Sequence, residues 1–422
     1  MSTIAQPTTS SPVAGPRSPL PLSLYIHIPW CVRKCPYCDF NSHGLGKAAM
    51  PERDYVAALR ADLAGDLADF ADALAGREVT SVFFGGGTPS LFAPASITAI
   101  LDGASARIPF AADCEITLET NPGTVEHGRF DGYLAAGVNR ISFGVQSFDD
   151  DALQALGRIH SAAEAEAAVK LAQDAGFANI NLDLMYALPN QTVAGAIGDV
   201  ERALAHGPTH LSHYQLTLEP GTPFAKRPPP LPADDAAWDM QEACQARLAA
   251  AGYAQYEVSA YAQPGRRCRH NLNYWQFGDY LGIGAGAHAK ITGPGTVDSE
   301  LGGAAPARWV RRRWKVRSPR AYLQNAGTPR RIGGDDAIAP DQLPFEFMLN
   351  ALRLNDGVAA DSFAERTGLP LSAVAGRLGE ARARGWLTRD GSRLQATALG
   401  QRFLNDVIEA FLPSHRPERR HA

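Results

Sequence analysis

The stretch YIHIPWCVRKCPYC at residues 25–38 places three cysteines on one short segment. Cysteine thiolates hold iron–sulfur clusters, and a C-x3-C-x2-C loop lets three sulfurs reach three corners of a cubane. The fourth iron then has no protein ligand and can accept a small molecule. A zinc site is the alternative, but zinc usually takes four ligands, and the chain offers only His43 nearby as a fourth. The spacing therefore predicts a [4Fe–4S] cluster on Cys31, Cys35 and Cys38.

Strand-like and helix-like segments alternate over residues 22–220. The strand-like segments are short, apolar or β-branched, and mostly bounded by Gly, Pro or Asn. Six are predicted as strands, at 22–28, 79–84, 115–119, 139–143, 179–184 and 210–216. Helix-like stretches separate them, as at 54–73, 96–106 and 162–175. This alternation predicts an α/β fold of parallel strands with helical crossovers, in an open barrel or a doubly wound sheet.

Polar or glycine-rich motifs follow the ends of all six predicted strands. They are the cysteine loop at 31–38, GGGTP at 85–89, ETNPGT at 119–124, GVQS at 144–147, the region from Asp183 to 189, and TLEPGT at 217–222. Ligands of parallel α/β folds bind at the carboxyl ends of the strands. The shared position of the motifs therefore predicts that they converge on one site.

The cysteine loop and the segment before it resemble the radical S-adenosylmethionine (SAM) proteins related to oxygen-independent coproporphyrinogen III oxidase. The resemblance extends over residues 22–411. It implies a partial (β/α)6 radical SAM barrel whose cluster binds SAM at its open iron. Within this family the chain is most similar to the haem chaperone branch. The oxidase carries a further cysteine where this chain has Phe40, and the chaperone branch carries H-N-x-x-Y-W, which is found here at 270–275.

Several residues at the strand ends suit the parts of a SAM molecule. Gly86, Gly87 and Thr88 let the backbone approach the methionine end of SAM, although a purely structural turn is the alternative. Glu119 suits a ribose hydroxyl or an amino group, unless it is only a solvated strand end. Tyr37 is expected to pack beside the adenine.

The resemblance implies further SAM contacts at Tyr25, Gln146, Arg158, Asp183 and Thr217, and the oxidase binds a second SAM molecule. Arg158 can pair with a carboxylate, or it can be a surface charge at a helix end. Asp183 stands between two leucines, where a charge is costly unless it is paired or bound to a ligand. Taken alone, Tyr25 and Thr217 suit the core or the rim of a site equally well.

The segment 270–275 is the haem motif that the resemblance implies. His270 is expected to bind the haem iron through a neutral imidazole, and Tyr274 and Trp275 are expected to flank a porphyrin face. Without the resemblance, a histidine beside aromatics is more often a packed, hydrogen-bonded residue. Cys268 is an alternative iron ligand or a plain buried thiol. The basic run 311–317 suits haem propionates, an acidic partner or a solvated surface.

Composition limits the setting of the protein. A chain of 422 residues suggests two or three domains, and a net charge of −4 argues against bulk nucleic-acid binding. Six cysteines in a chain of this length do not form a disulfide scaffold, which predicts a reducing, cytoplasmic setting. Residues 1–21 are expected to be a disordered tail, and no apolar run approaches the roughly 18 residues of a membrane span.

The expected domains are a barrel at 22–230, a middle α+β extension at 231–330 that carries the haem motif, and a C-terminal domain at 331–422. The last segment is predicted to form helices, then a hairpin at 386–395 and a final helix. This order resembles a winged helix.

Two functions compete, and a shared fold cannot separate them. The first is a haem carrier that delivers haem to acceptor proteins, such as membrane-associated respiratory proteins, with no catalytic residue assigned. The second is an enzyme that oxidatively decarboxylates coproporphyrinogen III to protoporphyrinogen IX. Phe40 and the 270–275 motif favour the carrier. A third class, an RNA-modifying radical SAM enzyme, is disfavoured by the acidic charge and the few aromatics of the C-terminal helices.

Overall fold

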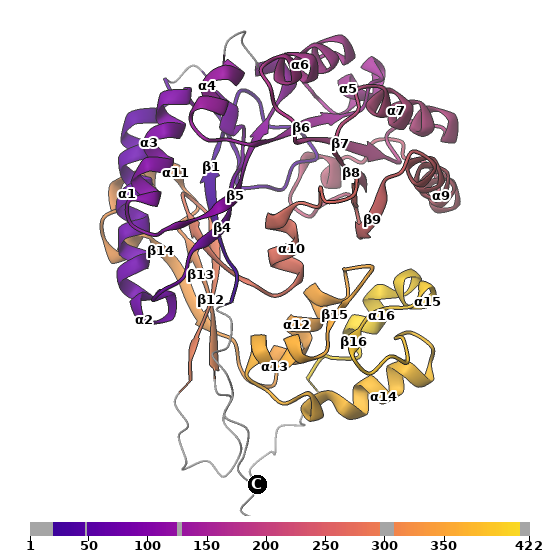
Figure 1. Ribbon diagram of the computed structural model, residues 1–422. Helices are drawn as coiled ribbons and strands as arrows, with labels where there is room; N and C mark the ends of the chain where they lie inside the picture. The colour runs from indigo at the N-terminus through magenta and orange to yellow at the C-terminus, as the bar shows by residue number, and fades with distance from the viewer. Residues whose placement is uncertain (1–19, 47–48, 125–128, 296–307, 414–422) are drawn as a thin grey trace, which may run out of the picture.

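The computed structural model describes residues 20–46, 49–124, 129–295 and 308–413 (Figure 1), so the expected tail at 1–21 falls almost wholly outside the described residues. The main feature is one mixed sheet of 12 strands. From edge to edge its strands are β14 (Ile332–Ala337), β13 (Arg308–Lys315), β12 (His288–Pro294), β11 (Asp279–Ile283), β1 (Leu22–Ile28), β4 (Val79–Gly86), β5 (Phe110–Thr120), β6 (Arg140–Gln146), β7 (Ile180–Tyr186), β8 (His210–Gln215), β10 (Ala260–Ala262) and β9 (Ala254–Glu257).

The strands from β11 to β8 run parallel, and the strands outside them are antiparallel. The six predicted strands are all present, and β1 has the predicted bounds. Within the described residues the sheet keeps two free edges, β14 and β9, so it is an open, partial barrel. The α/β prediction is confirmed, and the parallel strand β11 beside β1 is an addition that the sequence did not indicate.

Helices cover the outer face of this sheet, and α10 lies on its concave side (Figure 1). The helices up to the end of the extension are α1 (Glu52–Asp69), α2 (Ala71–Leu74), α3 (Pro94–Ser105), α4 (Arg129–Ala135), α5 (Asp150–Ala155), α6 (Ala162–Asp174), α7 (Val193–Ala205), α8 (Pro223–Lys226), α9 (Asp234–Ala250), α10 (Arg269–Trp275) and α11 (Pro319–Asn325), with short 3-10 turns at η1 (Pro89–Leu91), η2 (Pro122–Thr124) and η4 (Pro329–Arg331).

Local sequence explains these elements. The strand β1 is buried along nearly its whole length, as expected for a parallel strand covered on both faces. Helix α6 begins with a capping box, in which the Ser161 side chain accepts from the backbone of Glu164 and the Glu164 side chain accepts from the backbone of Ser161. Such caps satisfy backbone N–H groups that have no partner inside the helix.

Buried ion pairs join the extension strands to the barrel. Lys315 on β13 places its Nζ 2.7 Å from Asp62 and 2.6 Å from Asp66, and both aspartates belong to α1. Arg331 contacts the same two carboxylates at 3.0 and 3.1 Å. All four side chains are buried, so loss of one partner would leave an uncompensated charge in the interior.

The basic run 311–317 is therefore mostly internal to the protein. Its ion pairs within the described residues include Arg311–Asp335, Arg312–Glu346, Arg313–Asp66 and Lys315–Asp62. Arg317 follows β13 and is exposed, and no ion pair of its guanidinium is found in the described part of the chain.

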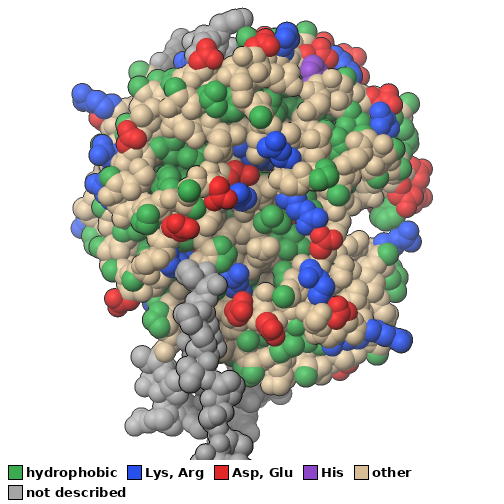
Figure 2. Space-filling view, in the orientation of Figure 1, with side chains coloured by type: hydrophobic (Ala, Val, Ile, Leu, Met, Phe, Trp, Pro, Cys, Tyr) green, Lys and Arg blue, Asp and Glu red, His purple; other side chains and the backbone are tan. Residues whose placement is uncertain are grey.

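The C-terminal domain lies below the sheet (Figure 1) and packs around an apolar cluster that it shares with the extension, which contributes Tyr256 and Phe277. Its elements are α12 (Leu343–Ala351), β15 (Val358–Ala359), α13 (Asp361–Thr367), η5 (Leu371–Val374), α14 (Ala375–Ala383), β16 (Arg393–Leu394), α15 (Ala398–Arg402) and α16 (Leu404–Glu409). Leu387 and Ala396 form an antiparallel bridge at the expected hairpin. Figure 2 shows side chains of both charge signs interspersed over the face in view. A helix long and apolar enough to cross a bilayer does not occur in the described ranges.

Candidate functional site

The cysteine loop covers a cavity at the carboxyl ends of the parallel strands, which we call the cluster cavity. The short strands β2 (Trp30–Cys31) and β3 (His43–Gly44) pair in parallel and close the base of the loop. All three predicted cluster cysteines are partly exposed and line this cavity. Residues predicted to contact SAM line it too, namely Tyr37, Gly86, Gly87, Thr88, Glu119, Gln146, Arg158 and Asp183.

Two glycines at the end of β4 let the backbone itself form the cavity wall. Gly86 has a φ of +111°, and a Cβ there would lie 2.4 Å from the His27 ring. A Cβ on Gly87 would lie 2.4 Å from the carbonyl oxygen of Trp30. Any larger residue would collide at both positions, so a ligand can approach the main chain here closely.

The three cysteines fit a cluster with one open iron. All three line one cavity, and burial raises the pKa of the Cys31 thiol, with the charges of Cys38 and Cys35 acting in the same direction. In the described part of the chain, no three His, Cys, Asp or Glu side chains meet closely enough to hold a single ion. A cubane offers three irons at separate corners, so three cysteines in one cavity wall suit it, whereas closed zinc sites use four convergent ligands.

Two carboxyl groups lie at the strand ends beneath the cysteine loop. Glu119 on β5 accepts a hydrogen bond from the backbone N–H of Gly86 at 3.2 Å. Burial raises the pKa of Glu119 to about 8, and the neighbouring Asp183 acts in the same direction. Asp183 on β7 accepts from Asn181 at 2.7 Å, and burial raises its pKa as well. A cationic or hydroxyl-bearing ligand would satisfy this acidic floor.

Gln146 and Arg158 are held in fixed positions at the far wall. Gln146 has a φ of +72°, which is unusual for a residue other than glycine, and its Oε1 accepts from the Tyr214 hydroxyl at 2.9 Å. Arg158 donates to the carbonyl oxygen of Gly144 at 2.6 Å and to the Cys35 sulfur at 3.7 Å. Strained backbone of this kind is found at ligand sites, where the surrounding structure holds it in place.

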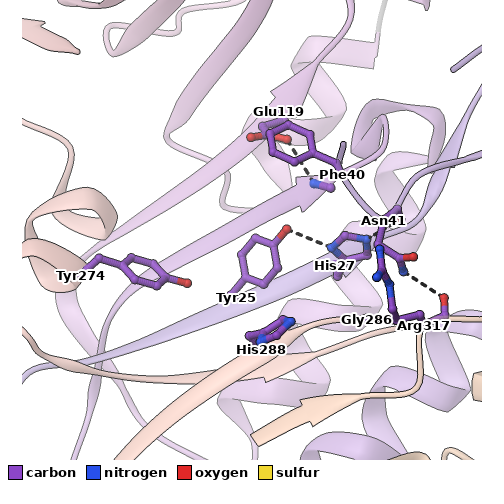
Figure 3. Close-up of a pocket in the computed structure, with 10 residues that line it drawn as sticks. Tyr25, His27, Phe40, Asn41, Glu119, Tyr274, Gly286, His288 and Arg317 are labelled. Carbon is purple, nitrogen blue, oxygen red and sulfur yellow. Dashed lines mark hydrogen bonds between the residues drawn. The ribbon is translucent and has the colours of Figure 1, made fainter. Parts of the chain in front are cut away.

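A second cavity of about 350 Å³ adjoins the cluster cavity (Figure 3). Phe40, Gly86 and Glu119 line both cavities and form their shared wall. The remaining residues that line the second cavity are Tyr25, His27, Asn41, Tyr274, Gly286, His288 and Arg317. The volume lies within the range of small-molecule sites, roughly 300–1,000 Å³.

Tyr25 and His27 point from β1 toward this second cavity, because alternate residues of a strand share one face. The Nε2 of His27 donates to the carbonyl oxygen of Asn41 at 3.0 Å, so the Tyr25 hydroxyl donates to Nδ1 at 3.0 Å. Burial lowers the pKa of His27 to about 4, in keeping with this neutral ring. Both nitrogens of His27 are therefore engaged.

Helix α10 carries the haem motif and directs its residues to different sides. The His270 ring stacks on Phe83 at 4.5 Å, and the next aromatic of its helical face, Tyr274, lines the second cavity. Trp275 instead packs against the C-terminal domain, with the Arg353 guanidinium 4.6 Å from its ring. Burial lowers the pKa of His270 to about 3, and its buried Nδ1 has no hydrogen-bond partner among the described residues.

Comparison with known proteins places the chain in a family. Residues 25–202 match the model of the radical SAM superfamily, and residues 338–403 match that of the HemN C-terminal domain. Heme chaperone HemW of Escherichia coli is 50% identical over 93% of this chain and 98% of its own length. Heme chaperone HemW of Mycobacterium tuberculosis is 35% identical over 95% and 97%. The chain belongs to the HemW family.

A solved structure shares the fold of this HemW-family chain. Coproporphyrinogen III oxidase of Escherichia coli, a radical SAM enzyme, matches 94% of this chain and 91% of its own with a TM-score of 0.74 at 23% identity. That identity establishes a common architecture alone. Membership of the radical SAM superfamily implies a [4Fe–4S] cluster and SAM, and the cluster cavity has the residues that these groups need.

Two of the predicted SAM contacts lie apart from the others in this HemW-family chain. Tyr25 faces the second cavity, and Thr217 is exposed and donates to Glu219 at 2.7 Å instead of lining the cluster cavity. Cys268 is buried and donates to Glu115 at 3.5 Å, as a plain packed thiol does. Sequence reasoning missed other residues that line the two cavities, among them His27, Asn41, Tyr214, Gly286 and His288, whereas Arg317 belongs to the basic run that it had singled out.

Proposed function

We propose that this chain is a cytoplasmic haem chaperone that binds haem and passes it to acceptor proteins. Its [4Fe–4S] cluster is held by Cys31, Cys35 and Cys38, with SAM at the open iron. Membrane-associated respiratory proteins are the proposed acceptors. The relatives named above are heme chaperones, and their similarity extends over nearly the whole chain, which supports carrying their function over to it.

The observation that carries this proposal is the second cavity. It adjoins the cluster cavity, is flanked by Tyr25 and Tyr274, and has helix α10 beside it. An apolar, planar ligand with acidic groups suits aromatic walls that have a basic residue, Arg317, at the rim. Haem has these properties.

His270 is the proposed iron ligand within α10. Burial lowers the pKa of His270 to about 3, which favours a neutral imidazole, and its buried Nδ1 has no hydrogen-bond partner among the described residues. Tyr274 is proposed to contact the porphyrin. Trp275 is proposed to act with it from the side of the C-terminal domain, by holding α10 in place against Arg353.

In the cluster cavity we propose that eight residues bind SAM. The backbone at Gly86 and Gly87, with Thr88, receives its methionine end, and Glu119 receives an amino or hydroxyl group. The remaining four are Tyr37, Gln146, Arg158 and Asp183. SAM supplies the radical chemistry of this superfamily when it is bound, and these side chains position it.

Decarboxylation of coproporphyrinogen III is the second candidate, because the oxidase shares the fold. Phe40 argues against it. This residue stands where the resembled oxidase has a further cysteine, and its exposed ring lines both cavities. An aromatic wall at that point suits porphyrin contact rather than additional thiol chemistry.

Haem titration of the reconstituted protein tests the proposal. We expect saturable binding in the absorption spectrum and transfer of the haem to apomyoglobin as a trap. His270→Ala should lose tight binding while its iron–sulfur content stays constant. A chain with a full cluster that binds no haem would refute the chaperone function, and an unchanged His270→Ala spectrum would remove that residue from its role.

The enzyme alternative has its own measurement. The reconstituted protein is incubated anaerobically with SAM, an electron donor and coproporphyrinogen III, and the products are analysed for loss of carboxyl groups. We expect none. Sustained turnover would make this chain an oxidase despite Phe40.

A further inference from the structure

The extension strands contribute a histidine to the second cavity. His288 begins β12, is exposed, and lines the cavity together with Arg317 (Figure 3). Its ring lies nearly parallel to that of Trp314 on β13, with 6.1 Å between the ring centroids. No hydrogen bond to the His288 ring is found within the described ranges.

Two other histidines are less available: His27, which lines this cavity, and His270, which does not. His27 has both nitrogens hydrogen-bonded, as described above. His270 is 6% exposed and lies behind Tyr25, whose ring centroid is 6.0 Å from its own. A carrier must receive and release its cargo, and an exposed imidazole can form and break a metal bond without opening the core.

The charges around His288 suit the same ligand. Partial burial and the nearby charges of Arg312 and Arg317 lower the pKa of His288. Arg312 is neutralised by Glu346 at 2.5 Å. Arg317 has no such partner in the described part of the chain, and a guanidinium pairs well with carboxylates. A neutral imidazole therefore stands beside an available cation.

We propose that His288 is an axial ligand of the haem iron at the mouth of the second cavity and that Arg317 pairs with a haem propionate. This inference rests on the proposed haem-binding function. His270 does not line this cavity, so it can supply a second histidine ligand only if the Tyr25 ring in front of it moves aside. Aromatic contact then comes from α10 and β1. Iron ligation comes from β12, and propionate pairing comes from the segment after β13.

Haem and metal-free protoporphyrin IX together separate these roles. Both are titrated into the reconstituted full-length protein and followed by absorption and electron paramagnetic resonance. His288→Ala should weaken haem binding at least tenfold, about 1.4 kcal/mol, and convert a six-coordinate low-spin spectrum to a five-coordinate one that added imidazole restores. It should leave protoporphyrin binding unchanged, because that ring has no iron. Arg317→Gln should weaken the binding of both.

Matched controls keep the test decisive. His206→Ala removes a histidine outside both cavities, and Arg320→Gln removes an exposed arginine on the adjacent helix α11. Both should bind haem as the unaltered chain does. If His288→Ala and His288→Gln keep the parent affinity and spectrum, the assignment is overturned. If the unaltered chain binds no haem, the proposed function itself fails, which is a separate result.

Discussion

The cluster cavity and the second cavity share a wall, yet the chain builds them differently. The cluster cavity takes its residues from the ends of the strands from β1 to β8, so they fall into short local groups along one continuous part of the chain. The second cavity joins β1 to β12, to α10 and to the residue Arg317, which are far apart along the chain. The first is a site of local motifs, and the second depends on how the extension docks against the barrel.

The largest effect is expected from removing a cluster ligand. Cys35→Ala leaves two thiolates on the loop, so the reconstituted protein should hold little iron or sulfide by chemical analysis. Cys114→Ala, a buried thiol on β5 absent from both cavity walls, is the control and should keep full content. Protoporphyrin binding should survive in Cys35→Ala. Its loss would show that the second cavity depends on the cluster for its structure.

Docking of the extension can be broken at Asp279, the first residue of β11. This buried carboxylate accepts from Arg77 and Lys290, each at 2.8 Å. Asp279→Ala leaves two buried cations without their carboxylate partner, so the free energy of unfolding should fall by about 3–5 kcal/mol in urea denaturation. Asp174→Ala, which removes an exposed pair with Lys170, should cost under about 1 kcal/mol. Equal losses would contradict the buried-network account.

The acidic floor of the cluster cavity predicts a pH dependence in the SAM-free protein. Glu119 has a folded-state pKa of about 8, against an ordinary 4.5, so the unfolded chain releases its proton first as pH rises. Folding stability is therefore lost between about pH 4.5 and 8, by at most roughly 1.4 kcal/mol per pH unit.

Glu119→Gln has no such proton, so its melting temperature should exceed that of the parent by a margin that grows from pH 5 to pH 8. A margin independent of pH would show that Glu119 is already ionised in the folded protein. SAM affinity should also fall in Glu119→Gln. Higher stability together with weaker SAM binding would show that the buried carboxyl group lowers stability but contributes to SAM binding.

The smallest effect is expected at Tyr214. Tyr214→Phe removes the hydroxyl that donates to Gln146, and a single hydrogen bond of this kind contributes about 0.5–1.5 kcal/mol. SAM affinity measured by calorimetry should fall roughly two- to tenfold, with haem affinity unchanged. If haem affinity falls more than SAM affinity, the assignment of Gln146 to the SAM site in the cluster cavity is wrong.

The six barrel strands could be predicted because each is an apolar run bounded by turn residues. Strand β11 could not, because glycines interrupt its pattern and its partner β1 lies over 200 residues earlier. The run 311–317 read as a charged segment, whereas it forms most of β13. Lys315 is buried there only because Asp62 and Asp66 of α1 neutralise it, and no local pattern reveals so distant a partner.

The site divides in the same way. The cysteines and most of the proposed SAM contacts could be found because each lies in a motif at a strand end. Thr217 follows β8, but the chain there turns away and bonds it to Glu219. His288 closes a glycine-rich segment with no motif of its own, and only the pairing of β12 with β13 brings it near Arg317. The available signal was that His288 and Lys290 are two residues apart, which places two polar side chains on one face of the strand.

Under the proposed binding of SAM and haem, the shared wall of Phe40, Gly86 and Glu119 would couple the two cavities thermodynamically. A ligand that shifts the Phe40 ring or takes the Glu119 proton on one side alters the surface offered to the other side. Linkage then requires reciprocity: the factor by which SAM changes the affinity for haem equals the factor by which haem changes the affinity for SAM. With the proposed ligands in place, the supply of one molecule would then set the affinity of the protein for the other.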